Sequence, residues 1–347
     1  MTVQVDSGES LQKVGGNTVC DRARVPETLT HELQILLNDL HAKHAPNSEG
    51  HVATYIPELT KAPPDEFGVC VVTAAGQVFE AGDCDRLFTI QSISKPFTYA
   101  LAMDELGAEK VHQHVGVEPS GDVFNSIELH GGTNRPFNPM INTGAITVTA
   151  LLHARHGDRT FDHVLDCFST IAGRRLTYDQ DVYESERRTG HRNRAIAHLL
   201  LNFGVVHDQA EAALDVYFKQ CAIQVTSRDL AMMGATLANM GCHPISGRSA
   251  FSIRYVKDIL SIMFTCGMYD YSGQWAYRVG VPAKSGVAGG VMAVVNRQLG
   301  IGTYSPRLDR FGNSVRGTEV CIDLASRLGL HVFDCVNVGS SFLDAIL

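Results

Sequence analysis

The stretch GGVMAVVNRQLGIGTYS, residues 289–305, places the strongest constraint on the fold. Apolar residues alternate or run continuously over 289–296 and again over 298–305, on either side of Asn296-Arg297, which is the pattern of a β-hairpin. A second pair of short strands is predicted in GVCVVTAAGQVFEAGD, residues 68–83, around a turn at Ala74-Ala75-Gly76. Strand character therefore lies toward both ends of the chain.

The residues between the two strand pairs are predominantly helical in pattern. From Ser92 to about residue 260 apolar residues recur at helical spacing, in segments that include 92–107, 142–155, 160–173, 191–202, 208–220 and 226–240. Two further helices are predicted, one over 26–45 that Thr28 or Thr30 would cap, and one over about 315–329. The sequence HVFDCV, residues 331–336, is expected to close the sheet or to pack beside it.

This order of elements predicts one α/β (α+β) unit whose sheet draws strands from both ends of the chain, with an inserted all-helical subdomain. Residues 1–25 are polar and rich in Gly, Ser and Asp, so we expect them to form a flexible N-terminal tail. Residues 26–347 would then form a single domain, with an α/β part at about 26–91 and 255–347 and a helical part at about 92–254.

Charge and hydropathy exclude several classes of function. The chain has 37 acidic and 29 basic residues and no basic block of five or more, so we expect no nucleic-acid partner. The longest apolar stretches, such as AIAHLLLNFGVV at 195–206, are interrupted and too short to cross a membrane. The first residues lack the basic start and apolar core of a secretory signal. Nine scattered cysteines without a CxxC pair are typical of reduced thiols, which favours a cytoplasmic location.

Histidines are frequent, but their spacing does not indicate a metal centre. His41 and His44 share one face of the first predicted helix, and His112 and His114 flank Gln113. No HExxH motif and no His/Cys cluster joins either pair, so both are interpreted as surface histidines. We therefore expect no metal and no organic cofactor.

Two short motifs point to nucleophilic catalysis. In QSISKP, residues 91–96, the proline places a helix start near Ser92, so that Ser92 and Lys95 lie three residues apart on one helical face. A desolvated lysine at this spacing can accept the proton of a serine and activate it as a nucleophile. Far downstream, Lys284-Ser285-Gly286 precedes the first strand of the late hairpin. SxxK followed by K[ST]G is the order of motifs found in β-lactamases and penicillin-binding proteins, which favours a serine acyl-transfer site.

A longer set of strings resembles the serine-dependent glutaminases, which hydrolyse L-glutamine to L-glutamate and ammonia. The matching strings occur in the family's order from residue 28 to about 340, and they are YIPEL (55–59), QSISKPF (91–97), NPMINTGAI (138–146), SERRTGHRN (185–193), LDVYFKQC (214–221), TLANMG (236–241), CGMYDYSG (266–273) and PAKSGVAGG (282–290). The resemblance implies a β-lactamase/transpeptidase-like fold with an antiparallel sheet, L-glutamine as the small-molecule substrate, and a homodimer or homotetramer.

The resemblance also implies roles for individual residues. Ser92 would be the nucleophile, Lys95 its proton-accepting partner, and Tyr269 a second group that moves the proton. The oxyanion hole would be formed by the main-chain N–H groups of Val287 and Ser92. The remaining positions that match substrate-binding residues of the family are Tyr55 at the pocket entrance, Asn142, Glu186, Asn193 and Tyr217. Thr143 departs from the alanine found in many members.

Other interpretations of these residues remain open on sequence alone. Asn142 is also a reasonable helix cap, Glu186 could pair with Arg187 or Arg188 in a charged loop, and Tyr217 could be a core residue of an amphipathic helix. At the level of the whole protein, the alternatives are a β-lactamase or penicillin-binding-type serine hydrolase, and a non-catalytic amino-acid sensor on the same fold. A complete set of Ser92, Lys95 and Tyr269 argues against a sensor, because binding alone requires no nucleophile.

Overall fold

The computed structural model describes residues 27–121, 127, 129–207 and 210–334. Its centre is a five-stranded sheet in the order β3-β2-β9-β8-β7, in which every neighbouring pair is antiparallel. The strands are β2 (Gly68–Thr73), β3 (Val78–Gly82), β7 (Ala283–Ser285), β8 (Gly290–Val295) and β9 (Leu299–Tyr304). Both predicted hairpins are confirmed, and β2 pairs with β9, so strands from the two ends of the chain lie side by side.

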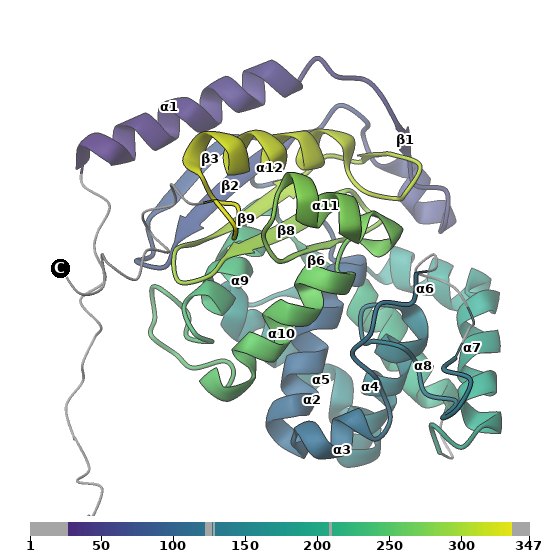
Figure 1. The fold of residues 1–347 in the computed structure, drawn as a ribbon. Helices are drawn as coiled ribbons and strands as arrows, with labels where there is room; N and C mark the ends of the chain where they lie inside the picture. Colours follow the sequence, from purple (N-terminus) through teal and green to yellow (C-terminus); the bar gives the residue numbers. More distant parts are fainter. Residues whose placement is uncertain (1–26, 122–126, 128, 208–209, 335–347) are drawn as a thin grey trace, which may run out of the picture.

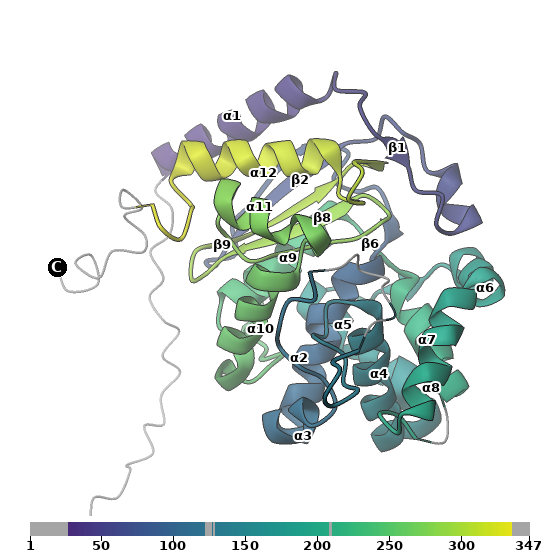
Figure 2. The same cartoon turned by 45° about the vertical axis from the view of Figure 1, so that its right-hand side comes forward.

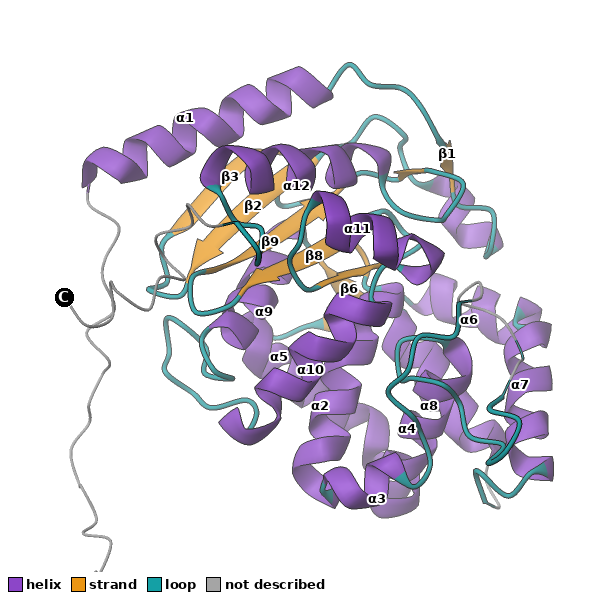
Figure 3. Cartoon of the chain, viewed as in Figure 1, coloured by secondary structure: helices purple, strands orange, loops and turns teal. Residues whose placement is uncertain are grey.

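Helices cover both faces of this sheet (Figures 1 and 3). On one face lie α1 (Glu27–His44), α11 (Ser272–Arg278) and α12 (Val315–Leu328), and on the other lies α9 (Ser227–Ala238). Side chains of successive strand residues point to opposite faces. Val69 and Val71 accordingly pack with the core under α1 and α12, whereas Cys70 and Val72 pack against α9.

Glycines allow α9 to approach the sheet closely. Gly300 and Gly302 alternate along β9 and face α9, so a Cβ atom at Gly302 would lie 2.1 Å from the Ser227 carbonyl oxygen. The same Cβ would lie 2.5 Å from the Ala231 amide nitrogen, so both conflicts are with helix backbone. The alternation seen in QLGIGTYS therefore specifies a helix-packing face as well as a strand.

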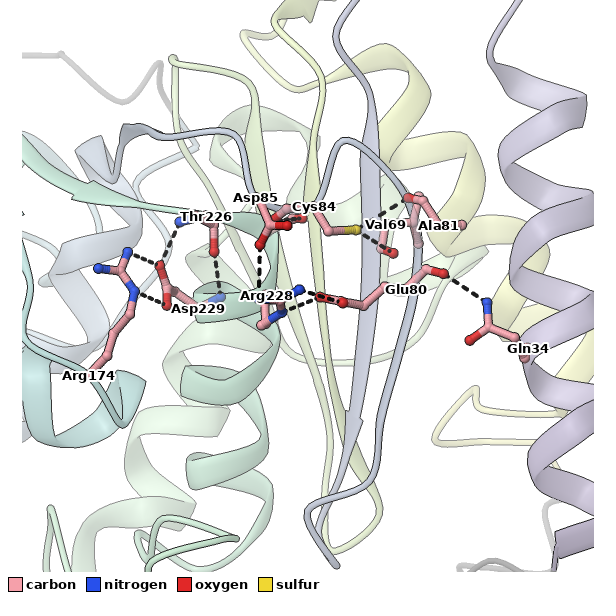
Figure 4. Close-up of polar contacts among 11 residues, drawn as sticks. Gln34, Val69, Glu80, Ala81, Cys84, Asp85, Arg174, Thr226, Arg228 and Asp229 are labelled. Atoms are coloured by element: carbon pink, nitrogen blue, oxygen red, sulfur yellow. Dashed lines mark hydrogen bonds and ion pairs between the residues drawn. The ribbon is translucent and has the colours of Figure 1, made fainter.

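Charged residues hold the beginning of α9 in place (Figure 4). Thr226 and Asp229 form a capping box, and Arg174 pairs with the Asp229 carboxylate at 2.6 Å. Arg228 pairs with Glu80 on β3 and, at 2.9 Å, with Asp85 after it. The first turn of α9 is thus joined both to the edge of the sheet and to the helical part of the chain.

The helical part lies beside the sheet and is entered through a 3₁₀ turn, η2 (Gln91–Ser94) (Figures 1 and 2). Its α-helices are α2 (Lys95–Leu106), α3 (Ala108–His112), α4 (Asn142–His156), α5 (Thr160–Ala172), α6 (Gln180–Thr189), α7 (His191–Asn202) and α8 (Ala210–Cys221). A further helix, α10 (Ile253–Cys266), leads back to the sheet.

Short elements complete the described structure. A small sheet has the order β4-β6-β5, and β1 pairs with β10. These short strands are β1 (His51–Val52), β4 (Phe88–Thr89), β5 (Thr177–Tyr178), β6 (Ile223–Val225) and β10 (Arg307–Leu308). The remaining 3₁₀ turns are η1 (Pro57–Lys61), η3 (Gly157–Arg159) and η4 (Tyr269–Tyr271). Within the described residues, no helix is long and apolar enough to span a membrane.

Some predicted details are wrong. The first helix begins at Glu27, so Thr28 and Thr30 lie inside it and neither occupies the cap position. The α-helix that follows Ser92 begins at Lys95, because Gln91–Ser94 forms a 3₁₀ turn first. Residues 331–334 of HVFDCV form no strand, and its last two residues lie outside the described ranges. The tail at 1–25 also lies outside them, and the division into an α/β and a helical part stays a prediction.

His44 is a further correction, because it is buried and not at the surface. It lies between Glu319 and Asp323 of α12, with nitrogen–oxygen distances of 2.9 and 2.7 Å. Lys43 adds a contact of 2.6 Å to Asp323. The end of α1 is therefore attached to α12 by polar contacts as well as by packing.

Replacing Gly302 with alanine is expected to destabilise the protein. The added methyl group meets helix backbone, so α9 must move away from β9, at a cost of about 1–3 kcal/mol of unfolding free energy. Gly273→Ala in α11 is the matched control, because a Cβ at that position meets no atom within 4 Å. Thermal melting of both variants tests the packing. Equal melting temperatures for the two variants would show that α9 does not need the close approach.

Candidate active site

Ser92 lies in a strained turn between the two parts of the chain. Strand β4 ends at Thr89. Proline is tolerated in the first turn of an α-helix but not in its interior, so Pro96 requires the helix to begin close to it. The chain makes the change of direction at Gln91, whose φ of 50° is in the left-handed region that non-glycine residues rarely adopt. Such strain persists only where the surroundings enforce it, and it is concentrated at functional sites. Ser92 itself is buried.

Lys95 is buried at the beginning of α2, and its amino group faces the beginning of α4. Its Nζ donates to the Met140 carbonyl at 3.1 Å and to Asn142 Oδ1 at 2.7 Å. Burial lowers the pKa of Lys95 from 10.5 to about 8, because a charged ammonium loses its hydration there. A lysine of this kind exchanges a proton far more readily near neutral pH than a surface lysine does.

A chain of amide side chains runs from Lys95 to Glu186. Asn142 Nδ2 donates to Asn193 Oδ1 at 2.9 Å, and Asn193 Nδ2 makes a longer contact of 3.4 Å with Glu186 Oε1. Tyr217 donates to Asn142 Oδ1, also at 3.4 Å. Asn142 is the first residue of α4 and Ile141 occupies the cap position, so Asn142 is not a helix cap. Its side chain is used entirely in this network.

Glu186 is a buried acid that faces the same network. It lies on α6 and is 2% exposed, whereas the exposed Glu184 of that helix pairs with Arg187. This excludes the interpretation of Glu186 as part of a charged surface loop. Burial raises the pKa of Glu186 from 4.5 to about 8, and the positive charge of Lys95 opposes that rise. Within the described structure its Oε2 has no hydrogen-bond partner. A buried carboxylate oxygen without a partner is costly and suits a cationic ligand.

Tyr217 serves both packing and polar contact. Its ring is buried in the core between α6, α7 and α8, as the packing interpretation proposed. Its hydroxyl nevertheless reaches Asn142. The two interpretations of this residue are therefore compatible.

Tyr269 is a further neighbour of Ser92. It also has a left-handed φ, of 57°, and its hydroxyl donates to the Ser285 carbonyl of β7 at 3.1 Å. Burial raises the pKa of Tyr269 to about 12, and hydrogen bonds with Ser92 and Ser285 limit the rise. The phenol therefore stays protonated at neutral pH.

Lys284 is a member of the site whose side chain the sequence analysis did not assign. Its Nζ lies 4.0 Å from the centre of the Tyr269 ring and donates to the carbonyls of Gly267 and Ser285 at 2.9 and 2.8 Å. The KSG motif was the available signal, but only its order after SxxK was used, and the lysine side chain was given no role. Cys221, on α8 beside Tyr217, is another unassigned neighbour of Lys95 and Glu186.

The KSG backbone does approach the nucleophile closely. A Cβ atom on Gly286 would lie 2.9 Å from the Ile90 carbonyl oxygen, so glycine is needed where β7 passes η2. Val287 follows and lines a groove of about 910 Å³ that Tyr55 and Phe311 also border. Tyr55 contacts Asn193 across 3.4 Å and is partly exposed. Tyr55 thus borders the groove and also contacts the buried network.

The comparisons with known proteins agree with this architecture. The glutaminase family model matches residues 50–333. A glutaminase of Trichormus variabilis is 54% identical over 306 residues, which are 88% of this chain and 92% of the relative. A glutaminase of Corynebacterium glutamicum is 46% identical over 93% of this chain and 76% of its own length.

Solved structures show the same fold. A crystal structure of a probable glutaminase of Bacillus subtilis has a TM-score of 0.81 at 36% identity, over 87% of this chain and 98% of the other. Mglu in its glutamate form has a TM-score of 0.84 at 44% identity, over 88% and 70% of the two chains. The predicted β-lactamase-like class, an antiparallel sheet with helices, is thereby confirmed. With a family match over most of its length and relatives above 50% identity, this chain belongs to the glutaminase family.

Proposed function

We propose that this protein hydrolyses L-glutamine to L-glutamate and ammonia through an acyl-enzyme on Ser92. The observation that carries the proposal is a buried carboxylate with an unpartnered oxygen, Glu186, at the other end of a polar network from Lys95. L-glutamine is a zwitterion with a neutral side-chain amide. It therefore brings the cation that Glu186 requires and an amide for the nucleophile.

Each part of the substrate has a matching group. The α-ammonium would pair with Glu186, and the α-carboxylate would accept hydrogen bonds from the side chains of Asn142, Asn193 and Tyr217. Tyr55 would cover the bound substrate from the groove. The side-chain amide would then reach Ser92, with the N–H groups of Ser92 and Val287 facing its carbonyl oxygen.

The acylation step follows from the proton affinities of the site. Ser92 Oγ attacks the amide carbon, a C–O bond forms, and the serine proton passes to the free base of Lys95. Negative charge develops on the carbonyl oxygen, where one well-placed N–H donor contributes about 3–4 kcal/mol to stabilising the transition state. The C–N bond then breaks as the nitrogen receives a proton and leaves as ammonia.

Lys95 is the better base and Tyr269 the better relay. With a pKa of about 8, Lys95 exists in both protonation states near neutral pH. Tyr269 stays protonated and donates its hydrogen, so it orients Ser92 and transfers protons without holding a charge. Water then attacks the acyl ester, the serine oxygen recovers its proton, and L-glutamate is released.

Ser92→Ala and Lys95→Ala are each expected to reduce kcat by at least ~10³-fold, since both residues belong to one proton-transfer unit. The double variant should be little worse than either single one. Ser94→Ala is the matched control, because Ser94 lies in the same turn but donates to the Gln91 carbonyl. A coupled assay for glutamate and ammonia measures the native protein and all four variants, with L-asparagine and nitrocefin as comparison substrates. Near-native turnover by Ser92→Ala would disprove the acyl-enzyme, and nitrocefin hydrolysis without ammonia release would disprove the substrate.

Glu186→Gln is expected to lower kcat/KM for L-glutamine by roughly ten- to several-hundred-fold, because a charge-assisted hydrogen bond is worth about 1.5–3 kcal/mol. N-acetylglutamine has no ammonium, so the preference for L-glutamine over it should shrink in this variant. Glu184→Gln, on the exposed side of the same helix, should leave both values unchanged. If the preference is the same in Glu186→Gln and the native protein, another residue recognises the ammonium.

The pH dependence of kcat/KM should show the ionisation of both buried groups, Lys95 and Glu186. Lys95 must be neutral to accept a proton and Glu186 must be ionised to bind the ammonium, and each pKa is about 8. Both competent states are lost as the pH falls below about 8, so log kcat/KM should fall with a slope approaching two. In Glu186→Gln one ionisation is removed and the slope should approach one. A profile that is flat between pH 6 and 8 would contradict the assignment.

A further inference from the structure

A second cluster of titratable side chains lies at the far end of the helical part. Glu105 is in the last turn of α2, His156 ends α4, and His163 is in the first turn of α5. Their ligand atoms all lie within 4.8 Å of one another, and this is the one such group of three among residues 27–121, 127, 129–207 and 210–334. The three helices contact one another and lie together in both views (Figures 1 and 2).

Both imidazoles direct the same atom at one carboxylate. His156 Nε2 lies 2.6 Å from Glu105 Oε2, and His163 Nε2 contacts the other oxygen, Oε1. The two rings are tilted by 37° to each other, and their centroids are 4.4 Å apart. Each Nε2 can interact with Glu105 in two ways. It can donate a hydrogen bond to the carboxylate, or it can offer its lone pair to a metal ion that the carboxylate also binds.

Two of the three residues lie where positive charge is favoured. Glu105 and His156 lie at the C-terminal ends of α2 and α4, where exposed carbonyl groups create negative potential. Arg155 already contributes to this balance, with its Nε 3.2 Å from Glu105 Oε2. Its side chain is half exposed, so it can move into solvent when another cation takes its place.

We propose that Glu105, His156 and His163 bind one Zn²⁺ ion, with water completing the coordination. Two imidazole nitrogens and one carboxylate oxygen are a ligand set that Zn²⁺ accepts in tetrahedral geometry. With Zn–N and Zn–O bonds near 2.1 Å, the ligand atoms of a tetrahedral site lie about 3.4 Å apart. The ligand atoms here lie within 4.8 Å of one another, so small side-chain rotations would bring them to that spacing. His163 is 40% exposed, which leaves a path for the ion and its water.

The ion would join three helices and would not take part in catalysis. Glu105 lies ten residues after Lys95 along α2, which corresponds to about 15 Å at 1.5 Å per residue. The ends of α2 and α4 opposite the cluster carry Lys95 and Asn142. A bound Zn²⁺ therefore stabilises the helices from which the site is built, without contacting substrate.

Calorimetric titration of the full, untagged chain with ZnCl₂ after EDTA dialysis tests the site. We expect one binding site per chain that is lost in His163→Ala and Glu105→Gln. His198→Ala is the matched control, because His198 pairs with a single carboxylate, Glu211, and should leave binding unchanged. Arg155→Ala should bind Zn²⁺ more tightly than the native protein, since a competing cation is removed.

Thermal melting and turnover measurements distinguish a stabilising Zn²⁺ ion from a catalytic one. At a Zn²⁺ concentration a hundred times Kd, the melting temperature should rise by about 4 °C in the native protein and not in His163→Ala. EDTA should reverse that rise and leave kcat for L-glutamine at 25 °C unchanged. The same kcat in the variants confirms that they are folded. Equal Zn²⁺ stoichiometry and affinity in native protein and His163→Ala, or no binding by native protein, would overturn the proposal. The cluster would then be a hydrogen-bonded His–Glu–His group.

Discussion

The burial of two ionisable groups of opposite type, Lys95 and Glu186, is the constraint on which the site depends. Each loses its hydration, and the shifts of both pKa values toward 8 express that cost. The amides of Asn142 and Asn193 stand between the two groups and bind both. The first turn of α4, α6 and the first turn of α7 must therefore keep fixed positions relative to α2. A substrate with its own positive and negative groups completes this arrangement, because it supplies Glu186 with a counter-ion.

Short-range sequence patterns correctly predicted those parts of the fold that depend on neighbouring residues. The two hairpins follow from alternation and turn residues, and the i, i+3 spacing of Ser92 and Lys95 follows from the position of Pro96. The exact start of the helix was missed, because a glutamine in the sequence does not indicate the left-handed φ that Gln91 adopts. The buried state of His44 was also missed, because its partners on α12 are about 275 residues away in sequence.

The binding half of the site was not predictable from spacing. Glu186, Asn193 and Asn142 come from three helices, and taken singly each has an ordinary structural interpretation. The resemblance to a family brought them together, and the hydrogen bonds between Asn142, Asn193 and Glu186 now give a physical reason for the grouping. The same limit explains why Glu105, His156 and His163 attracted no notice. His156 and His163 lie on two different helices joined by the turn η3, so no spacing rule within one helix predicts that their side chains meet.

Two of the residues with left-handed φ, Gln91 and Tyr269, show how the position of Ser92 depends on both the sheet and the helical part. Gln91 lies directly before Ser92 in the chain, and Tyr269 hydrogen-bonds with Ser92. Residues held in such conformations each cost about 1–3 kcal/mol, so both need support from rigid neighbours. That support comes where β7 passes η2, a contact that only a glycine at position 286 permits. Because β7 is hydrogen-bonded to β8, and α9 packs against β8 and β9, the position of the nucleophile depends on the packing of α9 against the central sheet.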